Sequence, residues 1–297
     1  MINRQALKAD LILMFVTLSW GLTFPLIEDA VRDVSPVVFV AARCLLAALI
    51  LLPLLYRKMK GVTTSLLTAA LILAVLNGMT YLSQSIGLET VTAARGAFLT
   101  GLNVIIVPFL LPFFGLGRTR KSDFLCALIC LVGLSVLTSG EKEWLSIGDV
   151  WILLCAFSYA VAIVYLQKVT QKLANLDALA FYQILLTGIV VSFFSVGHSY
   201  GHLLKPAAFI ALLFCAIFAT GLALWLQTKF QRYTTASRAA LIFTLEPIFG
   251  AIFGFFINGE ALGWRVYAGG FLIIVAILTS ELSRMYFDRH KVLSSRT

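Results

Sequence analysis

Charged side chains are scarce in this sequence. Only 12% of its 297 residues are Asp, Glu, Lys or Arg, whereas about 25% is usual for a soluble domain. Hydrophobic residues make up 60% of the chain, and the mean hydropathy is +0.96. A water-soluble fold of this length cannot hide so much hydrocarbon. We therefore predict a protein that has the lipid bilayer as its solvent.

The sequence also lacks the alternation of polar and apolar residues that is typical of strands. Its apolar residues form continuous runs of about 20 residues, the length at which an α-helix crosses the ~30 Å hydrocarbon core. Because lipid offers the backbone no hydrogen-bond partners, such runs predict helices. We predict an all-α integral membrane protein with ten transmembrane helices. The predicted spans are 9–28, 36–56, 66–88, 94–114, 122–139, 149–168, 177–197, 206–228, 238–258 and 264–283.

Residue sets that would indicate an enzyme or a metal site are missing. The five cysteines all fall inside predicted spans, and His198 and His202 are four residues apart without a third ligand nearby. The sequence has no Walker phosphate loop, no HExxH motif and no pair of acids at membrane depth. We therefore predict no metal site, no cofactor and no enzymatic activity.

Positive charge is distributed unevenly between the two sides of the predicted membrane protein. If the N-terminus is cytoplasmic, most of the Lys and Arg residues lie in the inside segments, as is usual for membrane proteins. The net charge of +9 is then a topology signal and not a sign of nucleic-acid binding. We predict a multi-pass protein of the cell (inner or plasma) membrane with both termini in the cytoplasm and no nucleic-acid partner.

The second half of the sequence resembles the first. After a shift of about 140 positions, polar residues of the two halves meet in the same order. Because five spans per half is an odd number, the second half is expected to be inverted in the bilayer. Inverted repeats build a central path that can open to either side. We predict repeats over 1–140 and 141–297. The matched residues include Asp10 and Asp149, Trp20 and Tyr159, Arg43 and Gln183, Gln84 and Gln227, and Arg95 and Arg238.

Glu246 is the residue that is most expensive to place in a membrane. It lies near the middle of the span 238–258, where an acid costs about 2–3 kcal/mol and normally faces a bundle interior or an aqueous cavity. Glu246 could bind substrate or a proton, or it could bond backbone groups freed by Pro247, which kinks the helix. We select it as the candidate coupling residue. Gly250 and Gly254 form a GxxxG pair that allows another helix to approach closely.

Polar and aromatic side chains recur at one-turn spacing on several spans. Amphipathic aromatic residues suit apolar or aromatic solutes, and amides can orient polar groups. Ordinary helix packing explains the same pattern, so both interpretations stay open. We predict a substrate cavity that is lined by Trp20, Thr23, Tyr81, Gln84, Asn103, Tyr159, Trp225, Gln227 and Glu246.

Arg43, Arg95 and Arg238 each lie at or inside a predicted span. Arg43 is eight residues into its span and could snorkel, bond backbone carbonyls or reach the cavity. Arg95 and Arg238 each open the fourth helix of their half, where they either snorkel to the interface or form symmetry-related gate or headgroup contacts. We predict structural or gate roles for Arg43, Arg95, Arg238, Pro247, Gly250 and Gly254.

Several runs resemble one known family. Residues 245–278, LEPIFGAIFGFFINGEALGWRVYAGGFLIIVAIL, resemble the ninth and tenth helices of the EamA branch of the drug/metabolite transporter superfamily. Further runs follow the same pattern, so the resemblance covers essentially the whole chain. These runs are LSWGLTFP (18–25), SPVVFVAARCLLAALILLPLL (35–55), TAARGAFLTGLN (92–103) and TASRAALIFTLEP (235–247).

The resemblance implies a ten-helix secondary active transporter that works by alternating access. Its central cavity would be lined by helices one, three and four and by their counterparts six, eight and nine. The family leans toward export of amino acids, drugs or other small organic metabolites. We predict that this export is coupled to protons or to exchange through Glu246. A monomer would suffice for transport, although a homodimer is compatible with the sequence. A channel or a sensor subunit is the alternative.

The two halves depart from the family pattern in different ways. The second half carries the family's Gly259-Glu260 pair, whereas the first half has Gly117-Arg118 at that place. The first half also has Asn103 where the second has Glu246. We therefore do not expect the two halves to act equivalently.

Overall fold

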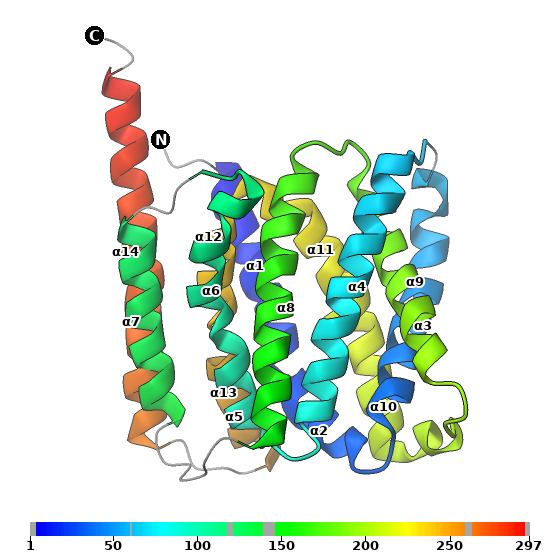
Figure 1. Cartoon of the computed structure of the whole chain (residues 1–297). Helices are drawn as coiled ribbons and strands as arrows, with labels where there is room; N and C mark the ends of the chain where they lie inside the picture. Colours follow the sequence, from blue (N-terminus) through cyan, green and yellow to red (C-terminus); the bar gives the residue numbers. More distant parts are fainter. Residues whose placement is uncertain (1–3, 60, 118–120, 139–145, 259–262, 295–297) are drawn as a thin grey trace.

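The chain folds almost entirely into helices (Figure 1). The computed structural model describes residues 4–59, 61–117, 121–138, 146–258 and 263–294, and no β-strand occurs within them. This confirms the predicted all-helical architecture. Six helical stretches of the described chain are long and apolar enough to cross a membrane, and two shorter helices are also apolar. The six are Arg4–Val31, Pro36–Lys58, Thr64–Gly87, Ile147–Thr170, Leu176–Phe194 and Pro206–Tyr233, and the two are Arg95–Leu110 and Tyr267–Ser280.

The first half of the chain contributes α1 to α7. Their bounds are α1 Arg4–Gly21, α2 Thr23–Val31, α3 Pro36–Leu55, α4 Thr64–Gly87, α5 Ala93–Gly101, α6 Asn103–Leu110 and α7 Lys121–Thr138, with 3₁₀ turns η1 Tyr56–Lys58 and η2 Pro112–Phe114. The second half contributes α8 to α14. Their bounds are α8 Ile147–Thr170, α9 Leu176–Phe194, α10 Pro206–Phe214, α11 Ala223–Phe230, α12 Ala236–Phe243, α13 Glu246–Asn258 and α14 Trp264–Ser294, with 3₁₀ turns η3 Gly201–Leu204 and η5 Gln231–Tyr233 and the π-helical segment η4 Cys215–Leu222.

Two of the predicted spans are divided next to a proline. A proline has no backbone N–H, and its ring clashes with the carbonyl four residues earlier. Pro25 lies four residues after Gly21, the last residue of α1, and Pro247 lies four residues after Phe243, the last residue of α12. The first and ninth spans are therefore each built from two helices, α1 with α2 and α12 with α13.

Two further spans are irregular where the sequence carries no proline. The fourth span divides at Leu102 into α5 and α6. The eighth span runs from α10 through η4 to α11, and the π-helical geometry of η4 leaves a wider turn. Such wide turns occur frequently at functional sites.

The helices run in both directions between the two ends of the bundle. In Figure 1, α1 and α12 begin at the upper end, whereas α5 and α8 begin at the lower end, and α14 ends at the upper end where α1 begins. The most extensive helix pairs are α7 with α14, α4 with α8, α3 with α9, and α4 with α9. Every one of these pairs joins a helix of the first half to a helix of the second.

The outer surface is apolar and the interior holds polar side chains. Phe113 is 84% exposed and Leu49 is 65% exposed, whereas Arg43 and Gln183 are each 1% exposed. Polar residues of transmembrane helices face the bundle interior, and apolar residues face lipid. The distribution of side chains therefore agrees with a bilayer environment.

Candidate functional site

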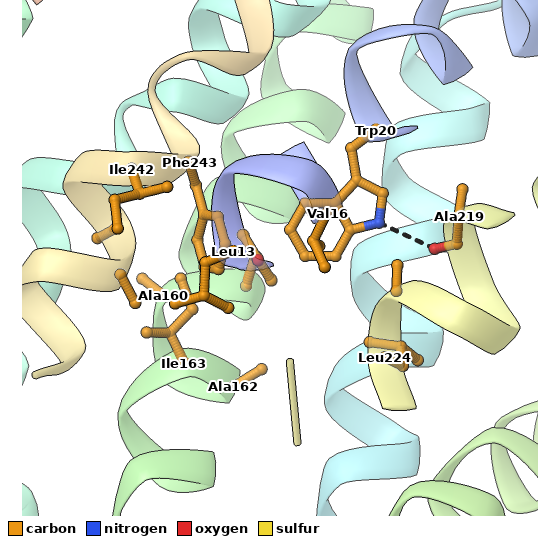
Figure 2. Close-up of a cluster of buried hydrophobic side chains, with 14 of the residues drawn as sticks. Leu13, Val16, Trp20, Ala160, Ala162, Ile163, Ala219, Leu224, Ile242 and Phe243 are labelled. Atoms are coloured by element: carbon orange, nitrogen blue, oxygen red, sulfur yellow. Dashed lines mark hydrogen bonds between the residues drawn. The ribbon is translucent and has the colours of Figure 1, made fainter. Parts of the chain in front are cut away.

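Three aromatic rings meet inside the bundle. Trp20 of α1 lies 5.6 Å from Tyr159 of α8 and 5.1 Å from Phe243 of α12, and the last two rings are 5.7 Å apart, measured between centroids. Figure 2 shows Trp20 and Phe243 among the apolar side chains of Leu13 and Ile163. The two predicted cavity residues Trp20 and Tyr159, which match in sequence, therefore touch. Sequence reasoning missed Phe243 because it looks like any apolar residue.

The polar tips of two of these rings bond to the eighth span. Trp20 Nε1 donates to the carbonyl oxygen of Ala219 in η4 at 2.9 Å (Figure 2). Gln227 Nε2 of α11 donates to Tyr159 Oη at 3.4 Å and to Gln231 Oε1 at 3.0 Å. The predicted residue Gln227 is thus part of this site, and Gln231, which we did not predict, supports it.

Glu246 and Asn103 occupy matched places in the two halves. Each is the first residue after the break in its span, at the start of α13 and α6 respectively. Glu246 is 5% exposed. Asn103 Nδ2 donates to the Thr100 carbonyl at 2.8 Å. The breaks thus bring both predicted residues into the interior.

Arg43 of α3 and Tyr81 of α4 form a second part of the interior. The guanidinium carbon lies 4.3 Å from the centroid of the Tyr81 ring, and Nε donates to Thr220 Oγ1 of η4 at 3.0 Å. Gln84, one turn beyond Tyr81, is also buried. Tyr81 of α4 therefore stacks on the arginine that binds Thr220 of η4, and Thr220 is one residue after the carbonyl that Trp20 binds.

The structure gives Trp225 and Thr23 different surroundings. Trp225 Nε1 donates to Asp177 Oδ1 at the start of α9 at 2.6 Å, and the ammonium of Lys229 lies 4.9 Å from its ring centroid. Thr23 Oγ1 donates to the Trp20 carbonyl at 2.7 Å, beside the break between α1 and α2. These contacts do not join either side chain to the three-ring cluster.

Two ion pairs, one buried and one partly buried, connect the halves of the chain. Arg238 Nε and Nη2 both lie 2.9 Å from Asp10 Oδ2. Arg95 Nε lies 2.7 Å from Asp149 Oδ1, and Nη2 lies 2.9 Å from Oδ2. The first pair joins α12 to α1 and the second joins α5 to α8, whose starts lie at opposite ends of the bundle (Figure 1).

The acidic partners in these pairs could have been found from the sequence. The alignment of the two halves matches Asp10 with Asp149 as well as Arg95 with Arg238. The alignment does not show which arginine binds which aspartate. In the structure each arginine binds the aspartate of the opposite half. Asp149 also accepts hydrogen bonds from the backbone and side chain of Ser146 at the start of α8.

A second set of matched contacts lies deeper in the bundle. Arg43 of the first half contacts Thr220 of the second. Gln183, the counterpart of Arg43, accepts a hydrogen bond at 3.3 Å from Asn77, which matches Thr220 in the alignment. Arg43 and Asn77 of the first half thus contact Thr220 and Gln183 of the second half. In both contacts the same two matched helix positions meet.

Glycine permits a close crossing of α1 and α13. A Cβ on Gly21 would lie 2.7 Å from Phe249 Cβ and 2.9 Å from the Glu246 carbonyl oxygen, and a Cβ on Gly250 would lie 3.5 Å from the Gly21 carbonyl oxygen. The predicted packing residue Gly250 therefore sits at a helix crossing, opposite a glycine that we did not predict. The surroundings of Gly254, and the positions 118, 259 and 260, lie outside the described residues.

The described residues contain no group of three or more His, Cys, Asp or Glu that could hold a metal ion. The five cysteines are free and buried. Of the two predicted loop histidines, His202 has its Nδ1 2.8 Å from the Asp33 carbonyl oxygen. The polar chemistry of the interior is therefore that of amides, hydroxyls, aromatic rings and a few charges.

Comparison with known proteins finds one family twice in the chain. The model of the EamA-like transporter family matches residues 7–139 and again residues 146–281. A protein of Archaeoglobus fulgidus named "Uncharacterized transporter" is 31% identical over 94% of this chain and 87% of its own length. The "Uncharacterized inner membrane transporter YedA" of Escherichia coli K12 is 24% identical over 98% and 96%. A solved crystal structure shares the fold, with a TM-score of 0.77 at 14% identity over 94% of this chain and 98% of that one.

Proposed function

Because this chain belongs to the EamA-like transporter family, we propose that it is a secondary active transporter that exports small organic metabolites, amino acids or drugs. The path runs through the interior between the two halves and is exposed to one side of the membrane at a time. The family and the transporter names of the relatives support membrane transport as the general function. Direction, substrate and mechanism are our proposal.

The proposed topology is ten membrane crossings in two inverted repeats, 1–140 and 141–297. The double match of one family model supports the repeat. Its inversion is supported by α1, which begins at the upper end in Figure 1, and its counterpart α8, which begins at the lower end. By the positive-inside rule the upper end, where α1 begins and α14 ends, is cytoplasmic.

The two exchanged ion pairs carry the mechanism. A carrier of this kind must close one end of its path while the other is open. The pair Asp10–Arg238 ties the halves together on the cytoplasmic side, and the pair Arg95–Asp149 ties them together on the outer side. Breaking one pair while keeping the other lets the halves rock apart at one end only. With both pairs formed, the path is closed at both ends.

The substrate is held between these two closures. Discontinuous helices at the repeat interface are a typical site for binding in such carriers, because their ends offer unpaired backbone groups. Here Glu246 and Asn103 start such half-helices, and Trp20, Tyr159 and Phe243 offer apolar surface. We assign Glu246 to proton or substrate binding, and a proton bound there would neutralise its charge during the transport cycle.

A flux measurement tests the proposal. The purified chain is reconstituted into vesicles loaded with a mixture of cell metabolites, and the solutes that leave are identified by mass spectrometry. We expect saturable release of a small set of solutes, compared with vesicles that lack the protein. Unitary electrical currents across the same membranes, or release that rises linearly with concentration, would identify a channel and contradict the proposal.

A further inference from the structure

We propose that Arg43 is the binding group for an anionic group of the substrate, so that the transported solutes carry a carboxylate next to an apolar body. This inference rests on the proposed transport function and names the substrate class of the same site. It depends on the charge, the burial and the contacts of one side chain.

Arg43 is a buried charge without a countercharge. Its side chain is 1% exposed, and within the described parts of the chain no carboxylate forms an ion pair with it. An arginine keeps its positive charge in proteins. Removing an unpaired charge from water is so costly that buried charges are normally paired. Arg43 therefore lacks the anionic partner that a buried charge normally has.

The contacts of Arg43 orient it and leave one nitrogen unused. The ring of Tyr81 lies under the guanidinium at 4.3 Å, and Nε donates to Thr220 Oγ1 at 3.0 Å. Both partners are neutral. Nη1 is buried and makes no hydrogen bond. A guanidinium fixed in this way presents a free donor, and its planar fork matches a carboxylate.

The second half of the chain shows that the fold does not need a charge at this position. Gln183, which matches Arg43, is equally buried and is bonded through both atoms of its amide. Its Oε1 accepts from Asn77 Nδ2 at 3.3 Å, and its Nε2 donates to Thr228 Oγ1 at 2.7 Å. A neutral amide therefore satisfies the same place in the architecture. The charge of Arg43 is an addition that helix packing does not explain.

The position of Arg43 also indicates what the rest of the solute is like. Thr220 directly follows Ala219, whose carbonyl binds Trp20 (Figure 2). Tyr81 belongs to the same buried hydrophobic cluster as Trp20, Tyr159 and Phe243. A solute that places its carboxylate on Arg43 can therefore lay an apolar or aromatic body toward the three-ring cluster.

Ligand-induced stabilisation of the purified full-length chain tests this inference. The probes are phenylacetate, its neutral analogue phenylacetamide, acetate, and sodium chloride at matched ionic strength. A ligand that binds the folded state raises the apparent stability by mass action. We expect phenylacetate to raise the unfolding temperature of the wild type and phenylacetamide to have no such effect. Equal effects of phenylacetate and chloride would mean an inorganic anion site and overturn the substrate assignment.

Arg43→Gln places the residue of the matched position at 43 and removes the charge. It should weaken phenylacetate binding at least about tenfold, the result of losing a charge-assisted hydrogen bond. The control Arg32→Gln removes an exposed arginine and should bind like the wild type. If Arg43→Gln does not fold, Arg43→Lys keeps the charge without the fork and should show weaker but measurable binding. Phenylacetate binding that is unchanged in these Arg43 variants, or absent in the wild type, overturns the inference.

The outcome can be separated from that of the flux experiment. Saturable release of neutral solutes only would keep the transporter and remove the role of Arg43. Arg43-dependent binding of phenylacetate, without release of any solute from vesicles, would keep the anion site and contradict transport.

Discussion

Two ion pairs, each between an arginine of one half and an aspartate of the other, connect the two halves. Asp10 binds Arg238, and Arg95 binds Asp149, so each half supplies one acid and one arginine. The sequence predicted which positions correspond, because matched residue types are visible in an alignment. It could not predict which side chains meet, since that depends on how the halves pack. The same reason explains why Phe243 and Gly21 were missed.

Glu246 gives the first prediction at the scale of the residue. Glu246→Gln keeps the shape of the side chain but cannot take part in proton exchange. We expect flux in vesicles that is driven by a pH gradient to fall at least about tenfold, because a step that depends on the charge of the carboxylate is lost. The control Asp33→Asn removes an exposed carboxylate and should leave the flux unchanged. Full gradient-driven flux in Glu246→Gln would contradict the proposed coupling.

The second prediction at the scale of the residue concerns Gly21. In Gly21→Ala the new methyl group would meet Phe249 Cβ at 2.7 Å and the Glu246 carbonyl at 2.9 Å, and neither is the end of a flexible side chain. Overpacking of this kind typically costs about 1–3 kcal/mol. We expect a lower unfolding temperature in detergent. Gly263→Ala is the matched control, because a Cβ there meets nothing within 4 Å. Equal stability of the two variants would mean that the crossing of α1 and α13 is looser than described.

At the scale of the helix, interruptions place the candidate site residues Asn103 and Glu246 at the starts of α6 and α13. The breaks beside Pro25 and Pro247 can be understood from the sequence, because a proline removes a donor and clashes one turn earlier. The division at Leu102 and the π-helical turn of η4 had no signal that we recognised. Hydropathy predicts how long an apolar run is, but it does not register how the hydrogen bonds of the backbone are arranged inside that run.

Pro247 gives the prediction at this scale. Pro247→Ala restores a backbone donor at the second residue of α13 and removes the clash with the end of α12. Because proline is tolerated in the first turn of a helix, but its ring clashes with the carbonyl four residues earlier, the variant should be at least as stable as the wild type. We expect slower transport nevertheless, since a continuous helix would move Glu246. Pro206→Ala, at the first residue of α10 where proline is well tolerated, should transport normally. Normal transport by Pro247→Ala would show that the break is dispensable.

At the scale of the whole molecule, composition was a sufficient guide to the class of fold. Scarce charge and long apolar runs predicted an all-helical membrane protein, and the helices and the family match agree with this. The distribution of Lys and Arg predicts in addition which end is cytoplasmic. That orientation depends on the cell and its membrane, so it cannot be read from the packing of the chain.

Labelling from the two sides of the membrane checks the orientation. Lys172 lies between α8 and α9, and Ser199 lies between α9 and η3, and both are exposed. In intact cells a membrane-impermeant maleimide should react with Ser199→Cys and not with Lys172→Cys. In inside-out vesicles the pattern should reverse. The five native cysteines are buried, so the unsubstituted chain is the control. Reaction of Lys172→Cys in intact cells would mean the opposite orientation.

The proposed transport cycle requires two closures that act at opposite ends of one path, and Cys155 can report on them. This thiol is buried in α8, four residues before Tyr159, and its Sγ is 4.0 Å from Thr100 Oγ1 of α5. In a variant that keeps only this cysteine, impermeant thiol reagents are applied from either side. Asp10→Asn should speed its reaction from the cytoplasmic side only, and Asp149→Asn from the outer side only. If both substitutions open the interior to the same side, or neither changes the rate, the two ion pairs are not alternating closures.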